Sequence, residues 1–293
     1  MKVGILAGTG LYELPGIEVL GEVEIRTPFG LPSDRFVHAR VHGHDVYFLP
    51  RHGRRHTLLP SEINGRANVW ALKSLGVDAV LSISAVGSLR ADLHPRDAVV
   101  VDQFIDRSKN AVSHTFFGDG AVAHISFAHP VCDDLRQRAA IAARRAAGRT
   151  EVRQVFERGV YVQMEGPAFS TAAESRLHRS WGGDVIGMTA LPEAKLCREA
   201  EICYAVVALV TDYDAGVEIG EPVTVARVIE HLQANAQFAR ELILEFLRDL
   251  PSQRPCPCHE ALRDALVTRW EDIPPATRER LRVLLQRYIP RDT

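Results

Sequence analysis

A long apolar run that ends abruptly in two carboxylates constrains this chain more than any other stretch. Residues 203–210 read CYAVVALV and are followed directly by Thr211, Asp212, Tyr213 and Asp214. A β-branched run without polar alternation predicts a strand of a parallel sheet that is buried on both faces. Because such a sheet needs helices on each side, the run predicts an α/β fold.

The position of Asp212 and Asp214 indicates a function as well as a fold. In open α/β sheets, ligands bind at the C-terminal ends of the strands. A carboxyl group held there partly out of water has a raised pKa, and it can keep or pass a proton at neutral pH. An ordinary solvated junction between strand and loop fits this stretch equally well, so other segments must distinguish the two interpretations.

Size and charge narrow the class of protein. With 293 residues, 46% of them apolar and 25% charged, the chain can bury a large core as one α/β domain or two smaller ones. A net charge of -2 argues against nucleic acid or an anionic membrane as the main partner. The N-terminal residues lack the pattern of a secretory signal, and no run is long enough for a membrane span. A cytoplasmic location is therefore expected.

Short apolar runs alternate with amphipathic segments along the rest of the chain, as the α/β interpretation requires. The expected elements are strands at 2–7, 79–85, 98–104 and 159–164, a hairpin at 36–49, and helices at 64–75, 132–148, 223–247, 261–269 and 275–288. Prolines at 251–257 separate the last two helices from the others.

Several strand ends carry residues suited to binding an anion. The glycine turn at 8–10 lets backbone amides approach an anion, and the Thr9 hydroxyl adds a donor. The segment RHGRRH at 51–56 supplies guanidinium groups, whose geometry matches phosphate. Ser84 and the Ala85 amide lie where another strand ends in small residues. A tight turn, a solvated basic loop and a closely packed turn are the respective alternatives.

Phe169 and Ser170 form a second candidate contact, in the loop after the strand at 159–164. An aromatic ring beside a hydroxyl can stack on a flat ligand and hydrogen-bond to its edge. Packing of Phe169 in the core is the ordinary alternative.

The cysteines and histidines do not predict a metal site. The five cysteines are an odd number in a chain without a secretory signal, so a disulfide framework is not expected. Cys256-Pro-Cys258 is too short for the usual zinc knuckle, and no second pair of ligands accompanies it in the sequence. His114, His124 and His129 are spaced too widely for a compact ligand set. Free thiols or a local disulfide are expected instead of a metal.

Taken together, these motifs resemble those of the trimeric purine nucleoside phosphorylase family, most closely its branch acting on S-methyl-5'-thioadenosine. The resemblance covers nearly the whole chain up to about residue 247. It rests on seven motifs in family order: GTG from residue 8, RHGRRHTLLPSEIN from 51, SAVGSLR from 84, DQFIDR from 102, EGPAFST from 165, IGMTALPEAKLCRE from 186 and TDYD from 211.

The resemblance implies a fold and an activity. The implied fold is a single α/β domain at 1–250, with a mixed central β-sheet flanked by helices, and a C-terminal helical extension at 251–293 packed on the same domain. The implied reaction is phosphorolysis of S-methyl-5'-thioadenosine to adenine and 5-methylthioribose 1-phosphate, in purine and methionine salvage. Inorganic phosphate would be a co-substrate, with no cofactor and no metal. A homotrimer is implied, and pairing of trimers into hexamers is left open.

Carried over to this sequence, the family pattern implies a role for each matched position. The implied phosphate-binding residues are Thr9, Arg51, His52, Ser84, Ala85 and Thr189. The implied base and ribose contacts are Phe169, Ser170, Met188, His56, Asp212 and Asp214. The implied pocket for the 5'-alkylthio group contains Val225, Val228, Ile229, and His124 from a neighbouring subunit. Within this set, Asp212 and Asp214 would be the catalytic residues, with Asp212 as the acid nearest N7 and Asp214 near the 6-amino group.

The two carboxylates favour a 6-aminopurine, because a 6-oxo group would place two acceptors face to face. By the resemblance, members that act on 6-oxopurines have asparagine instead. Ala215-Gly216 is smaller than the pair common in the methylthioadenosine branch, which leaves the preference among 5' groups open. The alternatives are a phosphorylase for methylthioinosine or other 6-oxopurine nucleosides, a hydrolytic nucleosidase, and a purine-binding regulator without catalysis.

Overall fold

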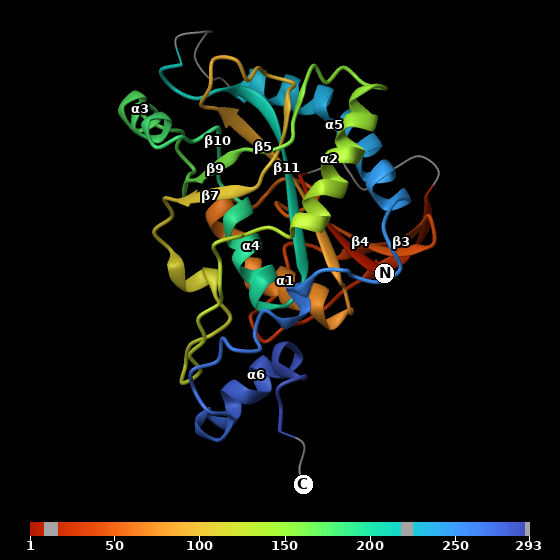
Figure 1. Ribbon diagram of the computed structural model, residues 1–293, viewed down its shortest axis with the longest axis vertical. Coiled ribbons are helices and arrows are strands. Elements are labelled where there is room, and N and C mark those ends of the chain that lie inside the picture. The colour runs from red at the N-terminus through yellow and green to blue at the C-terminus, as the bar shows by residue number, and fades with distance from the viewer. Residues whose placement is uncertain (9–16, 218–224, 291–293) are drawn as a thin grey trace.

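A mixed β-sheet occupies the centre of the molecule, and helices cover both of its faces (Figure 1). The computed structural model describes residues 1–8, 17–217 and 225–290, without the side chains at 111, 225–230 and 232–234. Within these residues the sheet has 11 strands. They are β1 (Lys2–Ala7), β2 (Glu18–Val23), β3 (Phe36–Val41), β4 (His44–Pro50), β5 (Ala79–Ser88), β6 (Ala98–Val100), β7 (Gln103–Asp106), β8 (Val155–Phe156), β9 (Val160–Gln163), β10 (Val185–Gly187) and β11 (Cys203–Tyr213).

The helices follow the expected alternation with strands. The α-helices are α1 (Gly65–Ser74), α2 (Asp133–Ala147), α3 (Ala172–Ser180), α4 (Ala190–Glu199), α5 (Val225–Arg248) and α6 (Pro275–Leu285). Short 3₁₀ turns occur at Pro60–Glu62, Ala111–His114, Pro257–Glu260 and Trp270–Asp272. Within the described residues, none of the helices combines the length and apolar character needed to cross a lipid bilayer.

The order of the strands is β2-β3-β4-β1-β5-β10-β9-β7, and β11 pairs with β5 and with β6 beside this path. β1 is parallel to β4 and β5, and β11 is parallel to β5, whereas β10 is antiparallel to β5. The predicted single-domain α/β fold with a mixed sheet is confirmed. The hairpin expected at 36–49 is also present, and its turn residues His42 and Gly43 have φ values of 48° and 82°. A two-residue turn with both φ values positive matches the twist of the strands that it joins.

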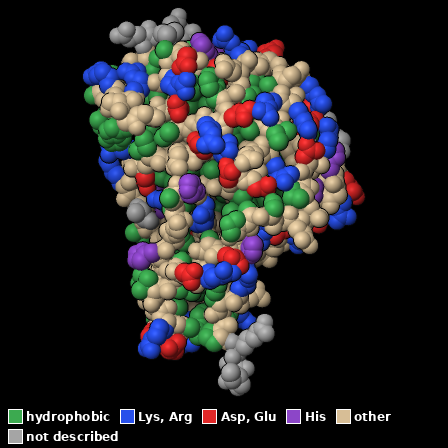
Figure 2. Space-filling model, viewed as in Figure 1, with side chains coloured by type: hydrophobic (Ala, Val, Ile, Leu, Met, Phe, Trp, Pro, Cys, Tyr) green, Lys and Arg blue, Asp and Glu red, His purple; other side chains and the backbone are tan. Residues whose placement is uncertain are grey.

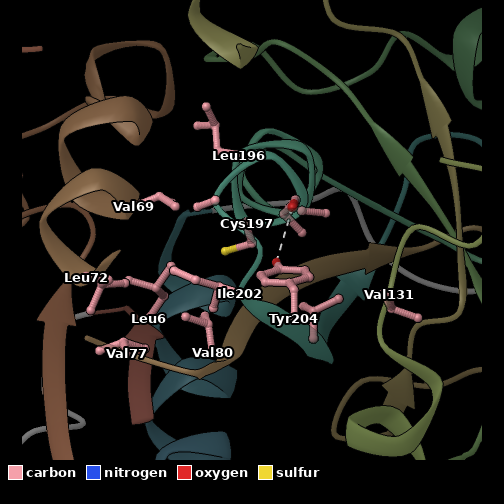
Figure 3. Close-up of a cluster of buried hydrophobic side chains, with 14 of the residues drawn as sticks. Leu6, Val69, Leu72, Val77, Val80, Val131, Leu196, Cys197, Ile202 and Tyr204 are labelled. Atoms are coloured by element: carbon pink, nitrogen blue, oxygen red, sulfur yellow. Dashed lines mark hydrogen bonds between the residues drawn. The ribbon is translucent and has the colours of Figure 1, made fainter. Parts of the chain in front are cut away.

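Each face of the sheet has its own hydrophobic core, because side chains alternate between the faces along a strand. Val80 and Val206 belong to the core on the face covered by α1 and α4, together with Leu72 and Leu196. Figure 3 shows part of this core, with Val80 and Leu72 near one another. The neighbouring residues Leu81, Cys203, Ala205, Val207 and Leu209 point to the opposite face, which α2 and α5 cover. The apolar run at 203–210 is thus buried on both sides.

The prediction of a single strand at 98–104 is wrong, because the structure has two strands there. The chain pairs with β11 as β6, leaves that strand after Val100, and pairs with β9 as β7 from Gln103 onward. Between them the Asp102 carboxylate accepts a hydrogen bond from the Gly159 amide at 3.0 Å. An apolar run shows that a segment is buried, but it does not show that the segment changes its partner strand.

The helix expected at 261–269 is also wrong. These residues form turns, and their backbone pairs with distant segments: the Val267 amide donates to Val122, and the Leu262 amide donates to Glu201. Such tertiary hydrogen bonds replace those of a helix, so local propensity does not decide the conformation. The next predicted helix is present as α6, which packs against α1. In Figure 2 this C-terminal part forms the narrow lower end of the molecule.

A gap in the sheet creates the space for a ligand. On one side of β5, β1 pairs with residues 79–82, and β10 pairs only with Gly87 and Ser88. On the other side β11 pairs along the whole of β5. Residues 83–86 therefore have no partner strand on the β1 side among the described residues, and this stretch of β5 faces a cavity.

Candidate active site

The cavity beside β5 has a volume of about 340 Å³, within the range of small-molecule sites. It brings together residues that are far apart in the sequence. The predicted site residues that line it are Arg51, His52, His56, Ser84, Ala85, Phe169, Met188, Thr189, Asp212 and Asp214. The end of β11 is not a solvated junction, because Thr211 and Asp214 are buried, with 2% and 6% exposure.

Asp212 lies at the end of β11, just after a local irregularity of the strand. The register between β11 and β5 shifts between Val210 and Asp212, which places both Thr211 and Asp212 at the cavity. The Thr211 hydroxyl donates to the Asp212 carboxylate at 2.5 Å. Burial nevertheless raises the pKa of Asp212 to about 6, aided by the nearby charge of Asp214. The side chain can therefore hold or release a proton close to neutral pH.

Asp214 is buried beside Asp212 and is oriented by a backbone hydrogen bond to β5. Its amide donates to the Ser88 carbonyl at 2.8 Å. Burial raises the pKa of Asp214, and the hydroxyls of Ser175 and Ser170 partly oppose that effect. The Oδ2 atom of Asp214 is buried and has no hydrogen-bond partner among the described residues. A buried acceptor of this kind is suited to a donor on a ligand, since leaving it unpaired is costly.

Gly87 lies next to both acidic side chains. A Cβ atom at this position would lie 3.5 Å from Oδ2 of Asp212, 3.6 Å from Cβ of Asp214 and 3.3 Å from the Ile186 side chain. A side chain here would therefore fill space between the two acids. The absence of a side chain at Gly87 leaves both carboxylates accessible from the cavity.

The Arg51 side chain is almost fully buried, with 2% exposure, and its guanidinium is largely engaged by the protein. Nε donates to Glu193 at 2.7 Å, and Nη2 donates to the Leu6 carbonyl and the Ser82 hydroxyl. Nη1 donates to the Ile83 carbonyl at 2.7 Å. Since a guanidinium has five N–H groups, one hydrogen on Nη1 remains for a ligand within the described part of the chain. Arg51 is thus fixed in one orientation before any ligand binds.

His52 is neutral at physiological pH. Burial lowers its pKa to about 4, and Nδ1 lies 2.9 Å from the Leu58 carbonyl. A carbonyl only accepts, so Nδ1 carries the proton and Nε2 is left as an acceptor. The ring stacks on His56 with centroids 4.5 Å apart. As a result, His52 suits a ligand group that donates, such as a hydroxyl or a protonated phosphate oxygen.

Ser84 and Thr189 line the cavity together with Arg51, and the buried Tyr161 hydroxyl lies next to Ser84. The Ser84 Oγ lies 3.4 Å from the Tyr161 hydroxyl and 3.5 Å from the Thr189 hydroxyl. Thr189 is the N-cap residue of α4, but its side chain makes no capping hydrogen bond. The N-terminus of a helix favours an anion, since its first amides have no partner within the helix. Together with Arg51, these groups form a site for a small anion.

Other residues that line the cavity are apolar or aromatic. Phe169 lines it with 52% of its surface exposed, so the alternative that Phe169 packs in the core is wrong. Met188 lies against Gly166, where any Cβ atom would overlap its sulfur. Ser170 does not line the cavity directly, but it is buried beside Asp214. The apolar and aromatic lining suits a flat, mostly apolar ligand.

Some of the predicted site residues do not line the cavity, and others lie outside the described residues. Thr9 lies outside the described residues, although Gly8 before it lines the cavity. Val225, Val228 and Ile229 fall in the first turns of α5, where the backbone is helical and the side chains lie outside the described part of the structure. His124 is exposed and does not line the cavity of its own chain, and its amide donates to the Ala265 carbonyl at 2.8 Å.

The cavity lining also includes residues that were not among the predicted site residues. α5 contributes Asn235, Ala236 and Ala239 to the cavity, and the Asn235 side chain donates to the Val210 carbonyl at 3.1 Å. A helical stripe of small residues leaves space beside a sheet, which is the sequence feature that indicates such a position. The remaining additions are Gly8, Pro60, Ile83, Val86, Gly87, Met164, Ile186, Gly187, Leu209 and Thr211.

Comparison with known families agrees with this geometry. A model of the phosphorylase superfamily matches residues 2–248. The chain belongs to the phosphorylase superfamily. The matched region includes every strand of the sheet and all of α5, and it contains all the residues that line the cavity. The C-terminal residues that include α6 lie beyond the superfamily match.

Similar proteins refine the position within the superfamily. The S-methyl-5'-thioadenosine phosphorylase of Geobacter sulfurreducens is 48% identical, over 98% of this chain and 99% of that protein. The crystal structure of a methylthioadenosine phosphorylase from an antarctic soil metagenomic library has a TM-score of 0.91 and 44% identity, covering 97% of this chain and 98% of the other. A variant adenosine/methylthioadenosine phosphorylase from Schistosoma mansoni, solved with methylthioadenosine, has a TM-score of 0.80 and 36% identity. The match covers 90% of this chain and 96% of the other. The resemblance inferred from the motifs is confirmed.

Proposed function

We propose that this superfamily member is a pentosyltransferase that cleaves S-methyl-5'-thioadenosine with inorganic phosphate. The products are adenine and 5-methylthioribose 1-phosphate, which serve purine and methionine salvage. One observation carries the proposal: a single cavity has an anion site at Arg51, Ser84 and Thr189, and paired acids at Asp212 and Asp214. No resident cofactor or metal is required for this reaction, because phosphate is the nucleophile.

The anion side of the cavity holds phosphate below the sugar. The N–H on Nη1 of Arg51, the hydroxyls of Ser84 and Thr189, and the Ala85 and Thr9 positions donate to phosphate oxygens. Neutral His52 accepts from a protonated phosphate oxygen or a ribose hydroxyl, and His56 lies beside it. As the glycosidic bond breaks, positive charge develops on the sugar, and the bound anion stabilises it electrostatically.

The acid side of the cavity acts on the purine. Asp212, with a pKa of about 6, donates a proton to N7 and improves the leaving base. The unpaired Oδ2 of Asp214 accepts a hydrogen from the 6-amino group, and Ser170 supports this edge. Phe169 covers the base and Met188 lies under the ribose. A 6-oxo group would offer a further acceptor to these acids, which disfavours hypoxanthine and guanine nucleosides.

The proposal also includes the binding of the substrate's 5'-alkylthio group and the assembly of the subunits. The family pattern assigns the apolar wall for the alkylthio group to the positions of Val225, Val228 and Ile229 in α5. His124, which is exposed and does not line the cavity of its own chain, completes this pocket from a neighbouring subunit of a homotrimer. Light scattering on the active enzyme checks the assembly, and an active monomer would contradict a shared pocket. Pairs of trimers are compatible with the same contact.

The proposed base selectivity gives a direct test. Methylthioadenosine and methylthioinosine differ only at position 6, so they form a matched substrate pair. With phosphate present, kcat/KM for methylthioadenosine is expected to exceed that for methylthioinosine by at least about 100-fold, since the buried acids pair with an amino group but not with an oxo group. Adenosine and inosine provide the same comparison without the alkylthio group. Equal or faster cleavage of the 6-oxo substrates would assign the enzyme to 6-oxopurine nucleosides instead.

A further inference from the structure

Four cysteines meet outside the cavity, at the beginning of β11. The Sγ atoms of Cys132, Cys203, Cys256 and Cys258 all lie within 4.8 Å of one another. Cys132 and Cys203 are buried, with 3% and 2% exposure, and the other two are partly buried. The expectation that no second pair of ligands accompanies Cys256 and Cys258 is therefore wrong, because two cysteines distant in sequence complete a set of four.

We propose that these four thiolates bind one Zn²⁺ ion as a structural tetrathiolate site. Zinc in structural sites is bound by four ligands in a tetrahedron, and Zn–S bonds of about 2.3 Å separate the sulfurs by about 3.8 Å. The Sγ atoms of Cys203 and Cys256 are 3.1 Å apart, and no pair exceeds 4.8 Å. The observed spacings bracket the zinc geometry, so small shifts of the side chains are sufficient for binding. Four sulfur ligands in a tetrahedral set select zinc over the hard cations, which prefer oxygen.

The surroundings of the cluster favour negative charge on sulfur. Cys132 is the N-cap residue of α2, a 15-residue helix, and makes no side-chain capping hydrogen bond. The positive end of the helix dipole stabilises a thiolate at this position.

The cluster is held in place by the backbone as well as by the thiols. The Cys132 amide donates to the Tyr204 carbonyl at 2.9 Å, and the Cys203 amide donates to Asp78 at 3.0 Å. Arg254, two residues before Cys256, donates from its side chain to the Glu201 carbonyl at 2.8 Å. The ligands thus come from three anchored segments: the start of α2, the start of β11 and the link after α5. A bound ion would attach the C-terminal segment to the sheet.

Cys197 provides a matched control. It is also fully buried and free, but it belongs to the core on the opposite face of the sheet and is not part of the cluster. If the loss of any buried thiol lowered the zinc content, Cys197 variants would lose zinc too. If only the four clustered cysteines bind the ion, Cys197 variants keep their zinc.

The test is metal analysis of the full chain, purified under reducing conditions without a histidine tag. Mass spectrometry of the metal content is expected to give one zinc per chain for the wild type and for Cys197→Ser. The Cys256→Ser, Cys258→Ser double variant is expected to contain at least about tenfold less zinc per chain than the wild type, because two of four ligands are removed.

A second measurement remains informative if the double variant does not fold. Stepwise modification of wild-type thiols with a mercurial should release the zinc as four thiols react, and Co²⁺ added to metal-free protein should give the visible bands of a tetrahedral tetrathiolate. A protein without metal, either with all five thiols free or with disulfides between the clustered cysteines, would overturn the proposal. Iron in place of zinc would overturn the choice of metal. None of these readouts depends on enzyme activity.

Discussion

Replacing Asp212 by alanine is expected to lower kcat for methylthioadenosine by about 10²- to 10⁴-fold, the range for losing a general acid. The reason is that the purine then leaves as an anion, without a proton at N7. Steady-state kinetics with saturating phosphate measures the effect. Tyr213→Phe is the matched control, since the adjacent residue does not line the cavity, and its kcat should stay near the wild-type value. A folded Asp212→Ala enzyme with near-normal kcat would rule out this carboxyl group as the proton donor.

The free energy of unfolding of the Asp212→Ala variant should also depend on pH differently from that of the wild type. Burial raises the pKa of Asp212 from 3.8 to about 6. Its contribution to stability is therefore complete below pH 3.8 and is lost as the pH rises through about 6, because the charged form is disfavoured in the folded state. Relative to the wild type, the alanine variant should gain up to about 3 kcal/mol between pH 4 and pH 7.5. Urea unfolding at both pH values measures this difference, which also verifies that the variant folds.

Replacing Glu193 by alanine is expected to lower the free energy of unfolding by about 3–5 kcal/mol, because it leaves the buried Arg51 charge without its partner. Both side chains are nearly inaccessible, at 3% and 7% exposure. The Glu193 carboxylate also accepts from Ser82 at 2.7 Å and from Tyr204 at 3.0 Å. Chemical denaturation measures the loss. Because Arg51 also loses its fixed orientation, KM for phosphate should rise in any protein that remains folded.

Two further variants separate the buried charge from other effects. Glu193→Gln keeps the size of the side chain and one acceptor oxygen without the charge, and should be less harmful than alanine. Glu24→Ala removes an exposed carboxylate that pairs with Arg35 at 3.2 Å, and should change stability by less than about 0.5 kcal/mol. Equal losses in Glu193→Ala and Glu24→Ala would contradict the importance assigned to the Arg51 pair.

The sequence predicted the sheet well where burial alone determines structure. The run at 203–210 and the hairpin around Gly43 follow directly from apolar pattern and turn chemistry. The division of 98–104 between two partner strands and the turns at 261–269 depend on tertiary hydrogen bonds, which no local pattern encodes. For the same reason, the meeting of Cys132 and Cys203 with the Cys-Pro-Cys segment is a property of the folded chain that the spacing of the cysteines does not indicate.

The sequence predicted the types of residue in the candidate site better than their arrangement and hydrogen-bond partners. Charged and hydroxyl residues at strand ends identify Arg51, Ser84 and Asp212 from the sequence alone. Their states were not predictable, since the neutral form of His52 and the single remaining donor of Arg51 depend on partners from other segments. Asn235 was missed because its position on α5 matters only once the helix lies beside the gap in the sheet.

Adenine release in the presence and absence of phosphate tests the central claim most directly. Methylthioadenosine is incubated with enzyme freed of bound phosphate, and both the base and the sugar product are quantified, the latter by phosphorus NMR. Cleavage is expected only when phosphate is added, with one sugar 1-phosphate formed for each adenine. Release of adenine and free methylthioribose in phosphate-free buffer would contradict phosphorolysis and would identify the enzyme as a hydrolytic nucleosidase.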